Sequence, residues 1–268
     1  MVIRTFCNPI PITDYILHIT TLLWEFSILF LTLLYFGALW MAFSYPANFL
    51  WNGIIFLLVL LISIKWISRK YFHFIILAFL FVGSVLLLPL IDSPSQAKAF
   101  LVLSAGVFYL AVLGAYRLGK YEKDLTAKAM SNLAALSALF CWFTAGYGWY
   151  LNIASPAWII MILFAIITFP IAYALFIVNE LKMNRSQRVF YGVFLSYLIA
   201  VSIWFQSSWP FGYLTTGVAA LIIFYSGWEI IRNYFLDKMT AKRLAFNILF
   251  LAGTASLILL SAKWYPAV

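Results

Sequence analysis

The sequence contains very little charge: 9% of its 268 residues are Asp, Glu, Lys or Arg, whereas 66% are apolar. Its mean hydropathy is +1.02. Soluble domains carry about 25% charged residues, and folding in water buries at most ~75% of the surface of a chain this long. A water-soluble fold could not hide so much apolar surface. The scarcity of charge therefore excludes a soluble globular protein and indicates that lipid surrounds the chain.

Residues that form disulfides or hold metals are also scarce. The two cysteines, Cys7 and Cys141, lie far apart without a CxxC spacing, and there are only two histidines. This composition predicts neither a disulfide nor a zinc site within the chain. The sequence has no HExxH helix, no GxxxxGKS/T phosphate loop and no GxGxxG turn. We therefore expect no metal and no cofactor, and the missing catalytic patterns favour a non-enzymatic protein over an enzyme.

Long apolar runs dominate the sequence instead. The clearest covers 157–178, where Thr168 is the only polar residue. A helix needs about 20 such residues to cross ~30 Å of hydrocarbon, and inside lipid a helix satisfies its own backbone hydrogen bonds. We predict an all-α, polytopic transmembrane bundle of about nine spans, forming a single integral-membrane domain over 1–268. The expected spans are 22–44, 47–66, 71–91, 97–117, 130–152, 157–178, 189–206, 211–231 and 244–262.

The positions of the cations provide an independent test of this span count. If the N-terminus is cytoplasmic and the spans alternate, every Lys and Arg except Lys98 and Lys263 falls on the inner side. Cytoplasmic loops are enriched in these residues, so the pattern predicts a cytoplasmic N-terminus, an outer C-terminus and insertion in the cell membrane. The inner cations are Arg4, Lys65, Arg69, Lys70, Arg117, Lys120, Lys123, Lys128, Lys182, Arg185, Arg188, Arg232, Lys238, Lys242 and Arg243.

The outer connections have a different composition, with few charges and a proline in each. Proline suits the first turn of a returning helix, and the order Ser93-Pro94-Ser95-Gln96 predicts an N-cap, an N1 proline and a capping-box Gln. Tryptophans gather on the same side, as in an interfacial aromatic belt. The prolines are Pro46, Pro94, Pro156, Pro210 and Pro266. The tryptophans are Trp51, Trp149, Trp158, Trp204, Trp209 and Trp264.

The first apolar stretch, from Tyr15 to Phe43, is too long for one upright crossing. We favour a cytoplasmic or interfacial segment at 1–21, with a short interfacial helix at about 13–22, ahead of a bundle that covers 22–262. One long tilted helix is the alternative.

Four charged residues near the cytoplasmic ends of spans are the candidates for a polar cavity: Glu25, Glu180, Glu229 and Arg232. Charge at membrane depth suggests function. Glu229 precedes Arg232 by three residues, which predicts an ion pair on one helix face. Glu180 similarly precedes Lys182 and Arg185. Glu25 is the strongest candidate, because its sequence neighbours include no cation. The competing interpretation is that these carboxylates only neutralise the basic inner loops.

Two classes of function remain from the sequence. The favoured one is a non-enzymatic scaffold, assembly subunit or binder of lipid-like molecules, because catalytic patterns are missing and small residues recur at helical spacing. The alternative is a small-substrate transporter or a membrane-embedded enzyme with a cytoplasm-facing polar cavity around Glu25 and Glu229. Expected partners are membrane lipids, with other membrane-protein subunits as a further candidate. The basic residues have a topological explanation, so nucleic acid is not an expected partner.

Overall fold

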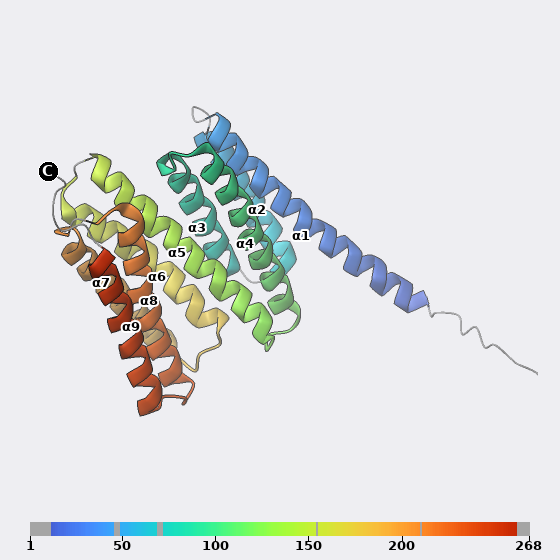
Figure 1. Ribbon diagram of the computed structural model, residues 1–268. Helices are drawn as coiled ribbons and strands as arrows, with labels where there is room; N and C mark the ends of the chain where they lie inside the picture. The colour runs from blue at the N-terminus through green and yellow to red at the C-terminus, as the bar shows by residue number, and fades with distance from the viewer. Residues whose placement is uncertain (1–11, 46–48, 69–71, 154, 210, 262–268) are drawn as a thin grey trace, which may run out of the picture.

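Every element in the described part of the chain is a helix (Figure 1). The computed structural model describes residues 12–45, 49–68, 72–153, 155–209 and 211–261. Within these residues, nine helices are long and apolar enough to span a membrane, in agreement with the predicted count. They are α1 Ile12–Ser44, α2 Phe49–Ser68, α3 Phe72–Leu87 with the 3-10 turn η2 Leu88–Leu90, α4 Pro94–Lys120, α5 Leu125–Ile153, α6 Ala157–Val178, α7 Arg185–Gln206, α8 Tyr213–Phe235 and α9 Ala241–Ser261.

Helix α5 is the centre of the bundle. It packs on α3 and α4 on one side and on α6 and α8 on the other. Figure 1 shows it running diagonally between these two groups of helices. Its buried face consists largely of small residues, including Ala134, Ala138 and Ala145. Helices in lipid gain no hydrophobic driving force from association, so small residues that allow close backbone packing stabilise the bundle. A continuous core extends from α1 to α8.

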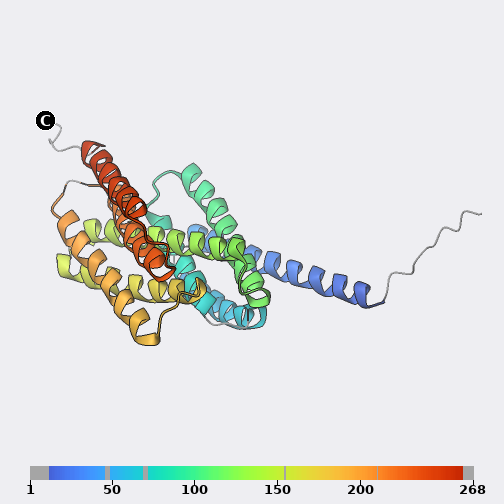
Figure 2. The ribbon, with the colours of Figure 1, turned by 90° about the horizontal axis from the view of Figure 1, so that it is seen from below.

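Helix α9 lies at the periphery of the bundle. Its main packing partner is α8, and Figure 2 shows it on the outer side of that helix. Large apolar side chains point away from the protein along its length; Leu249 is 71% exposed and Leu257 69% exposed. In a membrane this surface faces hydrocarbon.

Helix α1 differs from the favoured prediction. A separate interfacial helix at about 13–22 was expected, but residues 12–44 form one continuous helix, so the alternative of a single long helix is correct. The physical reason is that no proline or glycine occurs between Ile12 and Phe36 to interrupt the helical hydrogen bonds. The first turns of α1 project beyond the other helices (Figures 1 and 2).

Two helix starts refine the predicted boundaries. Helix α4 begins at Pro94 after the N-cap Ser93, as expected, but the Ser93 side chain makes no capping hydrogen bond. A complete capping box occurs instead at α7. There Asn184 accepts from the Gln187 backbone N–H, and the Gln187 side chain accepts from the Asn184 N–H, at 2.8 and 2.9 Å. This box starts α7 at Arg185, four residues before the predicted span at 189–206.

Candidate functional site

The predicted ion pair on α8 is confirmed. Arg232 Nη1 lies 3.0 Å from Glu229 Oε2, and the other carboxylate oxygen accepts a hydrogen bond from Asn233 Nδ2 at 3.0 Å. The Arg232 guanidinium also lies over the Trp228 ring, 5.2 Å from its centroid. Both oxygens of Glu229 and the charge of Arg232 are therefore engaged within α8 itself.

Glu180 has a different partner from the one predicted. It follows the C-cap of α6 in the left-handed backbone conformation, with φ 50°, and its carboxylate lies 2.7 Å from Lys128 Nζ on α5. The expectation of a local pair with Lys182 or Arg185 was wrong, because the turn directs the side chain across to α5.

A pair of amides joins the same two helices, α5 and α6. The side chains of Asn132 and Asn179 donate to each other at 3.2 and 2.8 Å. The ion pair and the amide pair therefore join the start of α5 to the connection between α6 and α7.

The four candidate charges do not form one group. Glu229 and Arg232 are paired on α8, which packs on α5, α7 and α9. Glu180 is tied to Lys128. Glu25 lies on the exposed side of α1, which packs on α2, α3 and α4. The polar cavity expected around them stays a prediction, and the geometry directs attention elsewhere in the bundle.

Asp124 directly precedes α5, and both of its carboxylate oxygens accept hydrogen bonds. Its Oδ1 accepts the backbone N–H groups of Thr126 and Ala127 at 2.9 and 3.1 Å, and its Oδ2 lies 2.7 Å from an Arg117 nitrogen. The Ala127 N–H, followed by the Arg117 charge, holds the pKa of Asp124 below its ordinary value. Asp124 is therefore an N-cap and an anchor for the end of α4.

A buried hydroxyl cluster joins three helices in the first half of the bundle. The Tyr35 hydroxyl on α1 bonds Ser84 on α3 at 3.1 Å and Ser104 on α4 at 2.5 Å, and the two serines bond each other at 2.9 Å. The Tyr35 ring stacks on Phe108, with centroids 4.0 Å apart. All three hydroxyls have partners, so the cluster stabilises the packing and leaves no free polar group for a ligand. The sequence analysis did not single out these residues.

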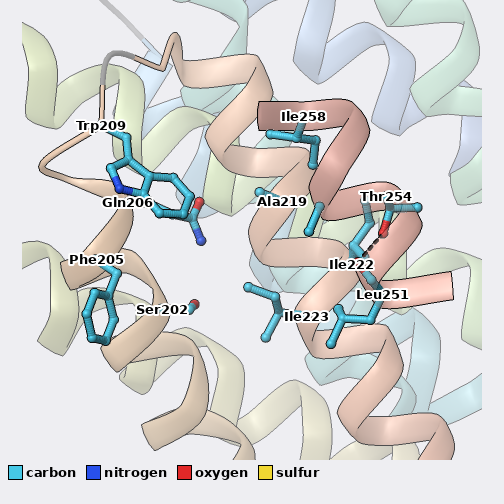
Figure 3. Close-up of a pocket in the computed structure, with 11 residues that line it drawn as sticks. Ser202, Phe205, Gln206, Trp209, Ala219, Ile222, Ile223, Leu251, Thr254 and Ile258 are labelled. Carbon is cyan, nitrogen blue, oxygen red and sulfur yellow. Dashed lines mark hydrogen bonds between the residues drawn. The ribbon is translucent and has the colours of Figure 1, made fainter. Parts of the chain in front are cut away.

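A pocket of about 290 Å³ lies between α7, α8 and α9 (Figure 3). Helix α7 contributes its last turn and α8 its middle turns, while the exposed helix α9 forms the third wall. The lining is largely apolar, with Ser202, Gln206 and Thr254 as its residues with amide or hydroxyl groups and an indole N–H on Trp209. The hydroxyls of Ser202 and Thr254 already donate to backbone carbonyls of their own helices. Gln206 is therefore the polar side chain that distinguishes this pocket.

Gln206 is the last residue of α7 and is only 3% exposed. Neither the amide nitrogen nor the amide oxygen of its side chain has a hydrogen-bond partner. Figure 3 shows the side chain projecting from α7 toward α8, near Trp209 and Ala219. Burying an unpaired amide costs about 1–3 kcal/mol, so each such group in a folded protein needs an explanation. A bound ligand is one explanation that also accounts for the pocket.

Further polar groups from α5 and α8 surround this end of α7. The Tyr147 hydroxyl on α5 donates to the Gln206 backbone carbonyl over 3.4 Å, and the Thr216 side chain on α8 lies beside that hydroxyl. One turn before Tyr147, the Thr144 hydroxyl is buried and makes no hydrogen bond. Gln206 was not predicted from the sequence, because it closes a predicted span and therefore resembles an ordinary interfacial residue.

A second cavity is larger but has no comparable polar group. It occupies about 450 Å³ between the ends of α1 and α3, η2 and α5. Its one polar ring nitrogen, Trp149 Nε1, donates to the Leu86 carbonyl at 3.1 Å. No described residue in its lining has an amide, hydroxyl or charged side chain. We therefore take the α7–α8–α9 pocket as the candidate functional site.

The fold and the site define a multi-pass α-helical membrane protein with a largely apolar pocket beside the buried amide of Gln206. In the described part of the chain, no three His, Cys, Asp or Glu side chains lie together in an arrangement that could hold a metal ion. Comparison with protein-family models, with curated proteins and with solved structures found no match to this chain.

Proposed function

We propose that this protein is a non-enzymatic membrane protein that binds a lipid-like molecule in the α7–α8–α9 pocket. The observation that carries the proposal is the unpaired, 3% exposed amide of Gln206 at one end of an otherwise apolar cavity. An amphiphile matches both the apolar walls and the polar amide. Its chain replaces lipid along the walls, and its head supplies the hydrogen bonds that the amide lacks. Ligand pockets typically combine apolar walls with a few such polar groups.

The surrounding membrane is the natural source of this ligand. The walls formed by Leu251 and Ile258 belong to α9, whose outer surface is exposed along most of its length. We further propose that the protein lies in the cell membrane with its N-terminus in the cytoplasm. The cationic connections after α2, α4, α6 and α8 support this orientation through the positive-inside rule. Membrane lipids are the proposed partners, with other membrane-protein subunits as a further candidate.

Native mass spectrometry of the purified protein tests the proposal. Ala219 lines the pocket from α8, whereas its neighbour Val218 is 39% exposed on the outside of the same helix. We expect wild type and Val218→Phe to carry a bound single-chain amphiphile, and Ala219→Phe to lose it because the new ring fills the cavity. Equal ligand mass on all three proteins, or no ligand on wild type supplied with membrane lipids, would contradict the proposal. Unfolding curves for both variants separate ligand loss from misfolding.

A further inference from the structure

We infer that the ligand's head group is neutral and both donates and accepts a hydrogen bond, as an alcohol does, and that Gln206 is the residue that recognises it. The inference rests on the proposed function and specifies the chemical class of its ligand. The Gln206 amide offers an NH₂ donor and a carbonyl acceptor, and both are unpaired. A hydroxyl group can satisfy both at once, by accepting from the amide nitrogen and donating to the amide oxygen.

The absence of charge in the pocket lining excludes ionic head groups. None of the residues that line the pocket is Asp, Glu, Lys, Arg or His. A carboxylate or phosphate placed at Gln206 would lose its hydration without gaining a cation, which is far more costly than burying a neutral polar group. The nearest charges along α8, Glu229 and Arg232, neutralise each other. Among membrane lipids, those with anionic or zwitterionic heads therefore do not fit this site, which leaves the neutral ones.

A pure hydrocarbon is a poor match for the opposite reason. It would fill the space against Ile222, Ile223 and Leu251 but leave both amide groups of Gln206 without partners. The volume adds a further limit. At about 290 Å³, the cavity lies at the lower end of the ~300–1,000 Å³ typical of ligand pockets. It therefore suits one short or partly inserted chain rather than a two-chain lipid.

The test compares ligands that share a chain and differ only in the head. Radiolabelled 1-decanol, decyl methyl ether, decanoate and decane are bound to the protein in nanodiscs, with wild type, Gln206→Leu and Ser196→Ala in parallel. We expect wild type to bind 1-decanol about tenfold more tightly than decane, which corresponds to one satisfied hydrogen-bonding site. The ether, which only accepts, should lie between them, and decanoate should bind most weakly.

The Gln206→Leu variant carries the decisive comparison. Leucine keeps a similar volume, so decane should still bind while the preference for 1-decanol disappears. Ser196→Ala, on the same helix but outside the pocket lining, should keep the preference, because the Ser196 hydroxyl donates to the Gly192 carbonyl. Equal binding of decanol and decane to wild type would overturn the inference and indicate that water alone satisfies Gln206. Tightest binding of decanoate would also overturn it. If no chain binds to any of the proteins, the proposed function itself fails.

Discussion

Thr144 on α5 and Gly217 on α8 are in direct contact, so that a Cβ at position 217 would lie 3.0 Å from both the backbone nitrogen and the Cα of Thr144. No side chain fits between the two backbones at this point. The contact fixes the helix that carries Tyr147 and Thr144 against the helix that carries Thr216 and Ala219. The polar end of the pocket is therefore positioned by the close approach of α5 and α8.

The first prediction follows from this contact. Gly217→Ala should destabilise the protein by about 1–3 kcal/mol, because the added methyl group forces the two backbones apart. Unfolding in SDS–detergent mixtures, followed by circular dichroism, measures the change. Gly253→Ala is the matched control, since no atom lies within 4 Å of the Cβ it would add on α9. Equal stability of the two variants would show that the α5–α8 contact is not tight.

The buried hydroxyl cluster gives a second prediction. Tyr35→Phe keeps the stacked ring but removes the bonds to Ser84 and Ser104, and should cost about 1 kcal/mol. Combined with Ser104→Ala in a double-mutant cycle, it should show a coupling of about 0.6 kcal/mol, the average for hydrogen bonds in membrane bundles. Ser256→Ala, whose hydroxyl bonds only the Ala252 carbonyl on α9, should show no coupling to Tyr35→Phe. Strict additivity with Ser104→Ala would contradict the bonded cluster.

Acid stability provides a third prediction, centred on Asp124. The N–H of Ala127, together with Arg117, lowers the pKa of Asp124 in the folded protein. Its stabilising effect is therefore complete above the unfolded-chain pKa of about 3.9 and is lost as the pH falls through the lower folded-state pKa. Asp124→Asn keeps a capping oxygen but has no charge to titrate. Thermal unfolding from pH 7 to pH 2.5 should show the advantage of wild type over Asp124→Asn shrinking at the acid end. A constant difference across this range would contradict the assignment.

Orientation in the membrane gives a fourth prediction. In a Cys7→Ser background, cysteines are introduced at Ser95 and at Lys123, which are both exposed and lie in or beside connections at opposite ends of α4. An impermeant maleimide should label Ser95→Cys on intact cells and Lys123→Cys only after permeabilisation. Cys141 is buried and should stay unlabelled in both. The reverse pattern would invert the proposed topology.

The spans were predictable because the membrane imposes one strong constraint on each of them. Backbone groups in hydrocarbon must bond within their own helix, so apolar runs of about 20 residues define the elements. Boundaries failed where local side-chain chemistry extended a helix into the interface, as the Asn184–Gln187 capping box does for α7. The break expected within α1 failed because length alone does not interrupt a helix without a proline or glycine.

The candidate site was much less predictable, because it depends on which side chains meet. The i,i+3 spacing of Glu229 and Arg232 determines their pairing along one helix, so the sequence predicts it. The partner of Glu180 depends on the turn after α6. The burial of the unpaired Gln206 amide depends on where α7 ends relative to α5 and α8. Neither arrangement is marked by a regular residue spacing in the sequence. A glutamine at the end of an apolar run gives no signal until the neighbouring helices are in place.

Photolabelling tests the central claim, that the α7–α8–α9 pocket holds a chain-like ligand, most directly. A decanol that carries a diazirine near its chain end is activated with the protein in nanodiscs, and labelled peptides are identified by mass spectrometry. We expect labels on the pocket walls at 202–209, 219–223 and 251–258, and their loss in Ala219→Phe but not in Val218→Phe. Labels spread over the exposed faces of α1 and α2 as heavily as over these segments, and unchanged by Ala219→Phe, would contradict the account.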